Sequence, residues 1–77
     1  MLTHITQAIR TACDYPDTMH IGADTPMEDL VYDSIDCMEI AINLETMFRV
    51  SVSPQEIYKC ATVGDIESLL SQKIKAE

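Results

Sequence analysis

The chain has 77 residues, of which 47% are hydrophobic and 23% are charged, and its formal net charge is −8. This length suits one domain with a small core, and the composition is typical of a folded protein. The acidic charge disfavours nucleic acid, no apolar run is long enough to span a membrane, and the N-terminus does not resemble a signal peptide. We therefore expect a single domain over residues 1–77, a cytoplasmic location, and neither nucleic-acid binding nor membrane insertion.

The cysteines and the distribution of charge indicate the state of the thiols and the kind of partner. Cys13, Cys37 and Cys60 are odd in number and widely spaced, so they favour reduced thiols in or near the core over a disulfide framework or a metal site. Residues 11–48 contain nine acidic side chains and no Lys or Arg. Such a field attracts partners with basic surfaces.

The N-terminal part of the chain predicts one helix followed by a long loop. Residues 3–13 carry apolar side chains at steps of three and four, which is the pattern of an amphipathic helix. The polar residues 14–24 include proline and glycine and predict a surface loop. Within residues 25–30, Thr25 is a candidate N-cap and Pro26 suits the first helical position, so we expect one helical turn.

The second half of the chain predicts three further helices. Residues 34–49 contain no Pro or Gly and form about four turns, with Asp33 or Ser34 as the N-cap. Ser53-Pro54-Gln55-Glu56 predicts a short capped helix over residues 54–59, and a weaker start signal at residues 62–65 precedes a last amphipathic helix. The predicted fold class is all-α, a small antiparallel four-helix bundle with a long loop after the first helix and a short third helix.

The predicted helix over residues 34–49 has two apolar faces. One face is expected to point into the core and consists of Cys37, Ile40, Ala41, Leu44 and Phe48. The nearly opposite face consists of Ile35, Met38 and Ile42, where a helix of a small bundle should meet water. Either another segment covers this stripe, or it is ordinary scattered apolar surface, or it is a docking strip for partners, flanked by Asp36, Glu39 and Glu45.

Residues 30–40, which read LVYDSIDCMEI, resemble the Asp-Ser-Leu signature of acyl carrier proteins. The register of the resemblance continues without a gap to Leu70, through Leu44-Glu45, Phe48, Val52, residues 53–56 and Thr62-Val63. The resemblance implies that Ser34 carries covalent 4′-phosphopantetheine, transferred from coenzyme A by a phosphopantetheinyl transferase. It also implies that Asp33 contacts the magnesium of that enzyme, while the chain itself has no metal site and no catalytic residue.

The same resemblance implies a monomeric carrier that holds acyl groups as thioesters. Its other partners would be acyl-transferring and synthase enzymes with basic docking surfaces. The positions at which the family shelters the acyl chain correspond to residues that the sequence alone marks only as core: Met27, Ile40, Leu44, Phe48, Val52, Ile57, Cys60, Ile66 and Leu69.

Two departures from the family pattern leave the pathway open. Val31-Tyr32 replaces a glycine and a small residue before the Asp-Ser pair, and Arg49 lies where acidic residues are usual. Fatty acid, polyketide and other specialised lipid pathways remain candidates, as does an amino-acyl (peptidyl) carrier. We expect a free-standing protein, because no Pro- or Gly-rich linker flanks the predicted helices.

Three other functions compete with the carrier. One is an unmodified acidic adaptor that keeps the carrier fold and acts by docking. A hydrolase using Ser34 lacks the nucleophile-elbow pattern, and a calcium loop lacks the required alternation of acids with glycine.

Overall fold

Four α-helices and one 3₁₀ turn follow one another in the computed structural model, which describes residues 1–76. The elements are α1 (Leu2–Cys13), η1 (Met27–Asp29), α2 (Ser34–Phe48), α3 (Pro54–Lys59) and α4 (Val63–Ala76). Within these residues the only β-type pairing is an isolated bridge between Pro26 and Thr62. The predicted all-helical fold is confirmed.

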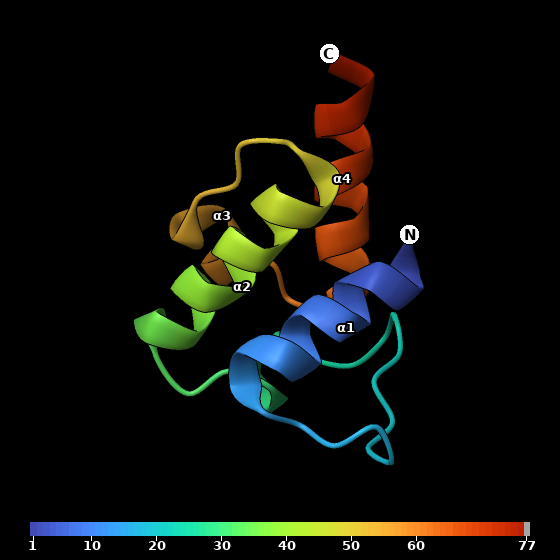
Figure 1. The fold of residues 1–77 in the computed structure, drawn as a ribbon, viewed down its shortest axis with the longest axis vertical. Coiled ribbons are helices and arrows are strands. Elements are labelled where there is room, and N and C mark those ends of the chain that lie inside the picture. Colours follow the sequence, from blue (N-terminus) through green and yellow to red (C-terminus); the bar gives the residue numbers. More distant parts are fainter. Residues whose placement is uncertain (77) are drawn as a thin grey trace.

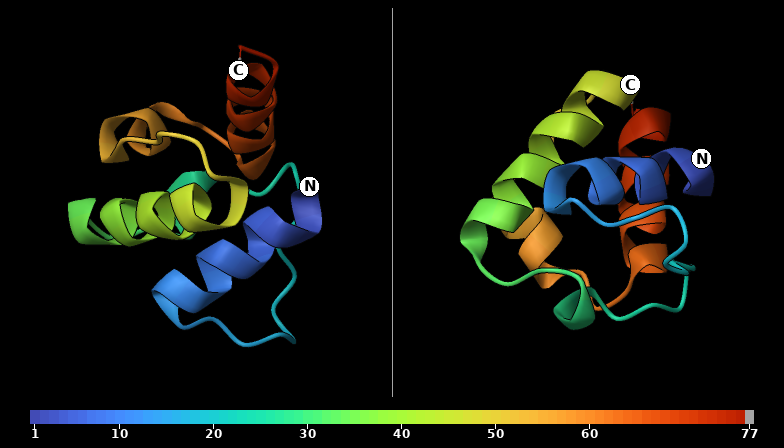
Figure 2. Two further views of the ribbon diagram at one scale, coloured as in Figure 1. Left: turned by 45° about the horizontal axis from the view of Figure 1, so that its top comes forward. Right: turned by 60° about the horizontal axis from the view of Figure 1, so that its bottom comes forward.

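The helices pack around one core. α1 and α2 lie against each other and run in opposite directions, while α3 packs against α2 (Figure 1). The first half of α4 crosses α1. The C-terminal half of α4 extends past the other helices (Figure 2). No helix in the described part of the chain combines the length and apolarity needed to cross a bilayer.

The core combines one face from each long helix with residues from the connections. Its fully buried members include Ile5 and Ile9 of α1, Ile40 and Leu44 of α2, and Ile66 of α4. Burying each such side chain contributes about 1.5–3 kcal/mol, which makes this cluster the main source of stability. The predicted core face of α2 is confirmed for Cys37, Ile40, Ala41 and Leu44.

Three predicted core positions lie nearer to the surface than expected. Phe48, in the last turn of α2, is only half-buried and meets the edge of the His4 ring at a centroid distance of 6.2 Å. Leu69 and Cys60 are also half-buried.

The long loop is tied to the molecule at both of its ends. The Tyr15 hydroxyl donates to the Leu30 carbonyl at 2.6 Å, and backbone bonds join Met27 N to the Ala61 carbonyl and Gly64 N to the Ala23 carbonyl. A Cβ at Gly64 would lie 3.0 Å from the Ala23 carbonyl oxygen, so the close approach favours glycine there. These bonds set the position of η1 against the connection between α3 and α4.

The ends of the helices differ from the predictions at three points. α1 begins at Leu2, one residue earlier than expected. α2 ends at Phe48, because Arg49 has φ 56° and donates its N–H to the Glu45 carbonyl at 2.8 Å, closing the helix in the left-handed conformation. Thr25 does not cap η1; its hydroxyl accepts from Gly22 N at 2.9 Å instead, so the predicted turn forms without a side-chain cap.

Candidate functional site

The start of α2 places Ser34 at an exposed corner of the molecule. Asp33 is the N-cap: its Oδ1 accepts from Ile35 N at 3.0 Å and from Asp36 N at 3.2 Å. Asp36 completes the arrangement, since its Oδ2 accepts from Tyr32 N at 2.8 Å. Of the two cap candidates, the structure therefore selects Asp33, and the hydroxyl of Ser34 is left out of the cap.

The segment before Ser34 enters α2 without unusual backbone geometry. Neither Val31 nor Tyr32 has a positive φ, as the β-branched side chain of Val31 requires. Val31 packs against the core and donates its N–H to the Met27 carbonyl, whereas Tyr32 is 96% exposed. The Val31-Tyr32 departure from the family pattern thus places an aromatic side chain in solvent beside Ser34.

A small cleft of about 230 Å³ opens next to Ser34, between the start of α2 and α3. Its lining is mostly apolar and consists of Ser34, Cys37, Pro54, Gln55, Tyr58 and Lys59. A larger cleft of about 550 Å³ lies between η1 and α3, and Tyr58 and Lys59 line it as well. One face of α3 therefore borders both clefts.

The α3 side of the cleft was missed by the sequence reasoning. Gln55, Tyr58 and Lys59 follow the i, i+3, i+4 spacing of one helical face, and that signal was present in the sequence. The spacing alone does not tell what the face contacts, because no sequence pattern reports how α3 is oriented against α2.

The nine residues that the resemblance assigned to an acyl pocket do not line one cavity. Met27, Ile57 and Cys60 line the larger cleft, while Ile40, Leu44 and Ile66 are fully buried in the core. The others line neither cleft: Leu69 borders a hollow that shares Cys60 with the larger cleft, Val52 borders another hollow, and Phe48 lies at the far end of α2. An acyl chain that reached all nine would have to separate packed side chains.

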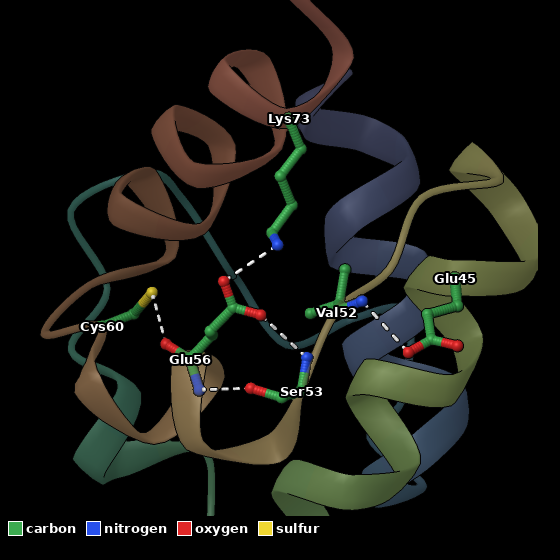
Figure 3. A network of polar contacts seen from close by, with 6 residues as sticks. All are labelled: Glu45, Val52, Ser53, Glu56, Cys60 and Lys73. Atoms are coloured by element: carbon green, nitrogen blue, oxygen red, sulfur yellow. Dashed lines mark hydrogen bonds and ion pairs between the residues drawn. The ribbon is translucent and has the colours of Figure 1, made fainter. Parts of the chain in front are cut away.

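A polar network around Glu56 joins α3 to its own start and to α4 (Figure 3). The predicted capping box is confirmed, because Ser53 Oγ accepts from Glu56 N and Glu56 Oε1 accepts from Ser53 N. Glu56 Oε2 also pairs with Lys73 Nζ of α4 at 2.9 Å. The hydrogen bonds from Lys73 and from the Ser53 backbone lower the pKa of the Glu56 carboxyl, although partial burial opposes them.

The second apolar face of α2 is exposed. Ile35 is 56% exposed, Met38 45% and Ile42 54%, so no segment within residues 1–76 covers them. Of the flanking acids, Glu39 is exposed and Asp36 is half-buried in its bond to Tyr32. Glu45 also has a structural contact, since its Oε1 accepts from Val52 N at 3.0 Å.

The acid–base groups near Ser34 and the three cysteine thiols bear on what chemistry the site could support. The residues that line the Ser34 cleft include no histidine or carboxylate to serve as a general base for the hydroxyl. Burial and then the nearby Asp36 raise the pKa of Cys13 to about 11 and also raise the pKa of Cys37. Burial and then Asp65 raise the pKa of Cys60, so none of these thiols is an activated nucleophile.

The fold is small and helical, and it exposes Ser34 at a helix start beside an apolar cleft and an acidic helix face. These are features of a carrier protein. Residues 3–70 match the family model described as "Phosphopantetheine attachment site". This match covers most of the chain, and the chain belongs to that family. The family's group is 4′-phosphopantetheine, which is bound covalently and carries the cargo, and its members generally do not act as catalysts.

Two similar proteins are both named "Acyl carrier protein, chloroplastic", from Brassica napus. They are 25% and 26% identical to this chain over 73 residues, which is 95% of the chain. Each match covers 54% of the relative, so the chain spans about half the length of these proteins. The predicted acyl carrier resemblance is confirmed at the level of the family.

Proposed function

We propose that Ser34 is the attachment residue of the phosphopantetheine arm and that the protein carries acyl groups between enzymes. The observation that supports this most directly is the exposed Ser34 hydroxyl, which the Asp33 cap leaves without a structural task. Ser34 is also the serine of the motif that resembles the family signature. The surroundings fit the group, because the cleft beside Ser34 is apolar and open.

Modification requires only that the Ser34 hydroxyl reach a phosphorus atom held by another protein. Ser34 Oγ forms a bond to that phosphorus of coenzyme A as the bond to the nucleotide portion breaks, and a base of the transferase takes the hydroxyl proton. Asp33 is proposed to contact the magnesium of the transferase with its carboxylate. Only Oδ1 of Asp33 is engaged by the cap, so the second carboxylate oxygen is available for the metal.

When bound, the group supplies a terminal thiol that holds acyl cargo as a thioester. Around it, Cys37, Pro54 and Tyr58 would offer apolar surface along one side of the cleft. The neighbouring cleft, which Met27, Ile57 and Cys60 line, is the proposed shelter for the start of an acyl chain. A longer chain would have to part the core beyond it, in the direction of Ile40, Leu44 and Ile66.

Partner enzymes are proposed to dock on the exposed apolar face of α2. The acids around Ile35, Met38 and Ile42 steer a basic surface towards this face, and the apolar contacts then hold it briefly. Arg49 and the exposed Met47 at the end of α2 disfavour enzymes that need an acidic contact there. We therefore propose a dedicated pathway, for a polyketide, lipid or amino-acyl product, ahead of general fatty acid synthesis.

The experiment that tests the attachment is intact-mass analysis after incubation with a phosphopantetheinyl transferase and coenzyme A. We expect one added phosphopantetheine, located at Ser34 by peptide sequencing. Ser34→Ala should abolish the addition, while Ser51→Ala, which changes another exposed serine, should leave it unchanged. No addition with several transferases would favour the unmodified adaptor, which also predicts that Ser34→Ala retains function in the cell.

The acyl cargo, the cellular location and the oligomeric state of the carrier are tested by separate measurements. The acyl group found on protein isolated from its own cell identifies the pathway, and the mass of that protein shows whether the carrier is free-standing. Cell fractionation tests the cytoplasmic location, and the monomeric state can be read from light scattering. Absence of turnover by the loaded carrier alone would support a purely non-catalytic role.

A further inference from the structure

The start of α2 has little capacity left to bind a phosphate. Helix N-termini bind anions through free N–H groups, but the N–H groups of Ile35 and Asp36 already donate to Asp33. The Tyr32 N–H donates to Asp36. A phosphodiester on Ser34 is therefore stabilised by the helix dipole but receives no hydrogen bonds from these three N–H groups. It also adds a third negative charge beside the carboxylates of Asp33 and Asp36.

One basic residue of α3 shares a cleft with Ser34. Lys59 lines the same small cleft as Ser34 and is the only basic residue in that lining. Within residues 1–76, the one ion pair found joins Lys73 to Glu56, so the Lys59 ammonium has no carboxylate within 4.0 Å. The side chain is exposed, and its flexible stem lets the ammonium move along the cleft wall.

The other basic residues either already bind another group or lie far from Ser34. Lys73 pairs with Glu56, and Arg10 donates to the Met19 carbonyl at 2.8 Å. Arg49 follows the last residue of α2, and a helix of that length separates it from Ser34 by about 20 Å. Lys75 lies in the last turn of α4, which extends away from the start of α2 (Figure 1).

We propose that Lys59 is the cationic partner of the phosphodiester on Ser34. This inference rests on the proposed attachment at Ser34 and adds to it a positioning residue on another helix. In the modified protein, the Lys59 ammonium and the phosphodiester close the mouth of the cleft from its two sides. The pairing joins the start of α2 to α3 and directs the first part of the arm along Tyr58, which borders both clefts.

The test compares thermal unfolding of the unmodified and modified forms of four proteins: wild type, Lys59→Met, Lys59→Arg and Lys75→Met. The measured quantity is the change in Tm on modification, so that effects of a substitution on the unmodified fold cancel. We expect the Tm of the modified form, relative to the unmodified form, to be about 2–4 °C lower in Lys59→Met than in wild type. This is the effect that an exposed ion pair produces in a domain of this length. Lys59→Arg should restore the wild-type value, and Lys75→Met should match it.

Two further measurements test whether Lys59 acts through its charge on the phosphodiester. Raising the salt concentration from about 0.1 M to about 1 M should remove most of the difference between wild type and Lys59→Met, because the Debye length falls to about 3 Å. The ³¹P resonance of the phosphodiester should shift on Lys59→Met and not on Lys75→Met. Both changes together would support the pairing.

The failure of this proposal and the failure of the attachment look different. If mass analysis shows the arm on Ser34 but the change in Tm is the same in wild type and Lys59→Met, the pairing is wrong and the attachment stands. If no arm is added to Ser34 at all, both proposals are wrong.

Discussion

Asp33 and Ser34 are adjacent residues with different tasks at the start of α2. Asp33 accepts two backbone hydrogen bonds, whereas the Ser34 hydroxyl accepts none from the first turn. Attachment of the proposed arm at Ser34 would therefore break neither of the two cap hydrogen bonds. The sequence predicted that one of the two residues caps the helix, but only the backbone geometry at Asp33, with φ −153°, decided which.

Two substitutions separate the structural task of Asp33 from its proposed role in modification. Asp33→Ala removes the acceptor of two N–H groups and should lower the free energy of unfolding by about 1 kcal/mol, measured by urea denaturation. Asp33→Asn keeps an oxygen acceptor, so we expect nearly wild-type stability. Both variants lack the carboxylate, so both should be modified more slowly by the transferase. Wild-type modification of Asp33→Asn would refute the magnesium contact.

At the scale of one element, α2 presents opposite faces to the core and to solvent. Ile40 and Leu44 are fully buried, while Ile35, Met38 and Ile42 are about half exposed. The sequence predicted both faces, because each depends only on the helical period within one segment. It left open whether another segment covers the second face, and the packing of α1, α3 and α4 elsewhere on the core decided that question.

Two methionines of α2 provide a matched test of the docking face. Met38 is 45% exposed and Met47 is 43% exposed, but nine residues place them on opposite sides of the helix. Met38→Glu should lower kcat/KM of the transferase about tenfold, the loss expected when an interface contact of about 1.4 kcal/mol is removed. Met47→Glu should have little effect, and both variants should keep wild-type Tm. A loss of Tm that matches the loss of activity in Met38→Glu would place this residue in the fold rather than in the interface.

At the scale of the whole molecule, α3 is held by its buried Ile57, by packing against α2 and by polar contacts to α4. α3 has only six residues, and Glu56 joins it to α4 through Lys73 and to its own start through Ser53. The pair lies near the surface, with the Lys73 side chain 25% and the Glu56 side chain 36% exposed. Because α3 forms one wall of the Ser34 cleft, the shape of the site depends on these contacts.

This ion pair should make stability depend on pH in the acidic range. The pKa of Glu56 is lowered in the folded state, so its contribution is complete above the unfolded pKa and is lost as the pH falls through the folded pKa. Lys73→Met should lower the free energy of unfolding by about 0.5 kcal/mol at pH 7, a small value because the pair is solvent-screened. The difference from wild type should close at low pH in urea denaturation.

Lys75→Met is the matched control for that measurement. It removes a lysine from the same last turn of α4 that has no ion pair within the described residues. We expect its stability to follow the wild-type pH dependence. A pH-independent effect of Lys73→Met would mean that packing of the side chain, rather than its charge, stabilises α3.

The sequence by itself determined the helices, the family and the candidate serine, while the tertiary structure decided what surrounds that serine. Helical period, the Ser53 capping box and the motif at Ser34 act within one or two turns, so they can be read from neighbouring residues. The Lys59 side of the cleft and the scatter of the expected acyl-pocket residues depend on how α3 packs against α2. Such contacts join residues that are distant in the chain, and local pattern carries no information about them. Ser34 was therefore predictable as a position, and its neighbours were not.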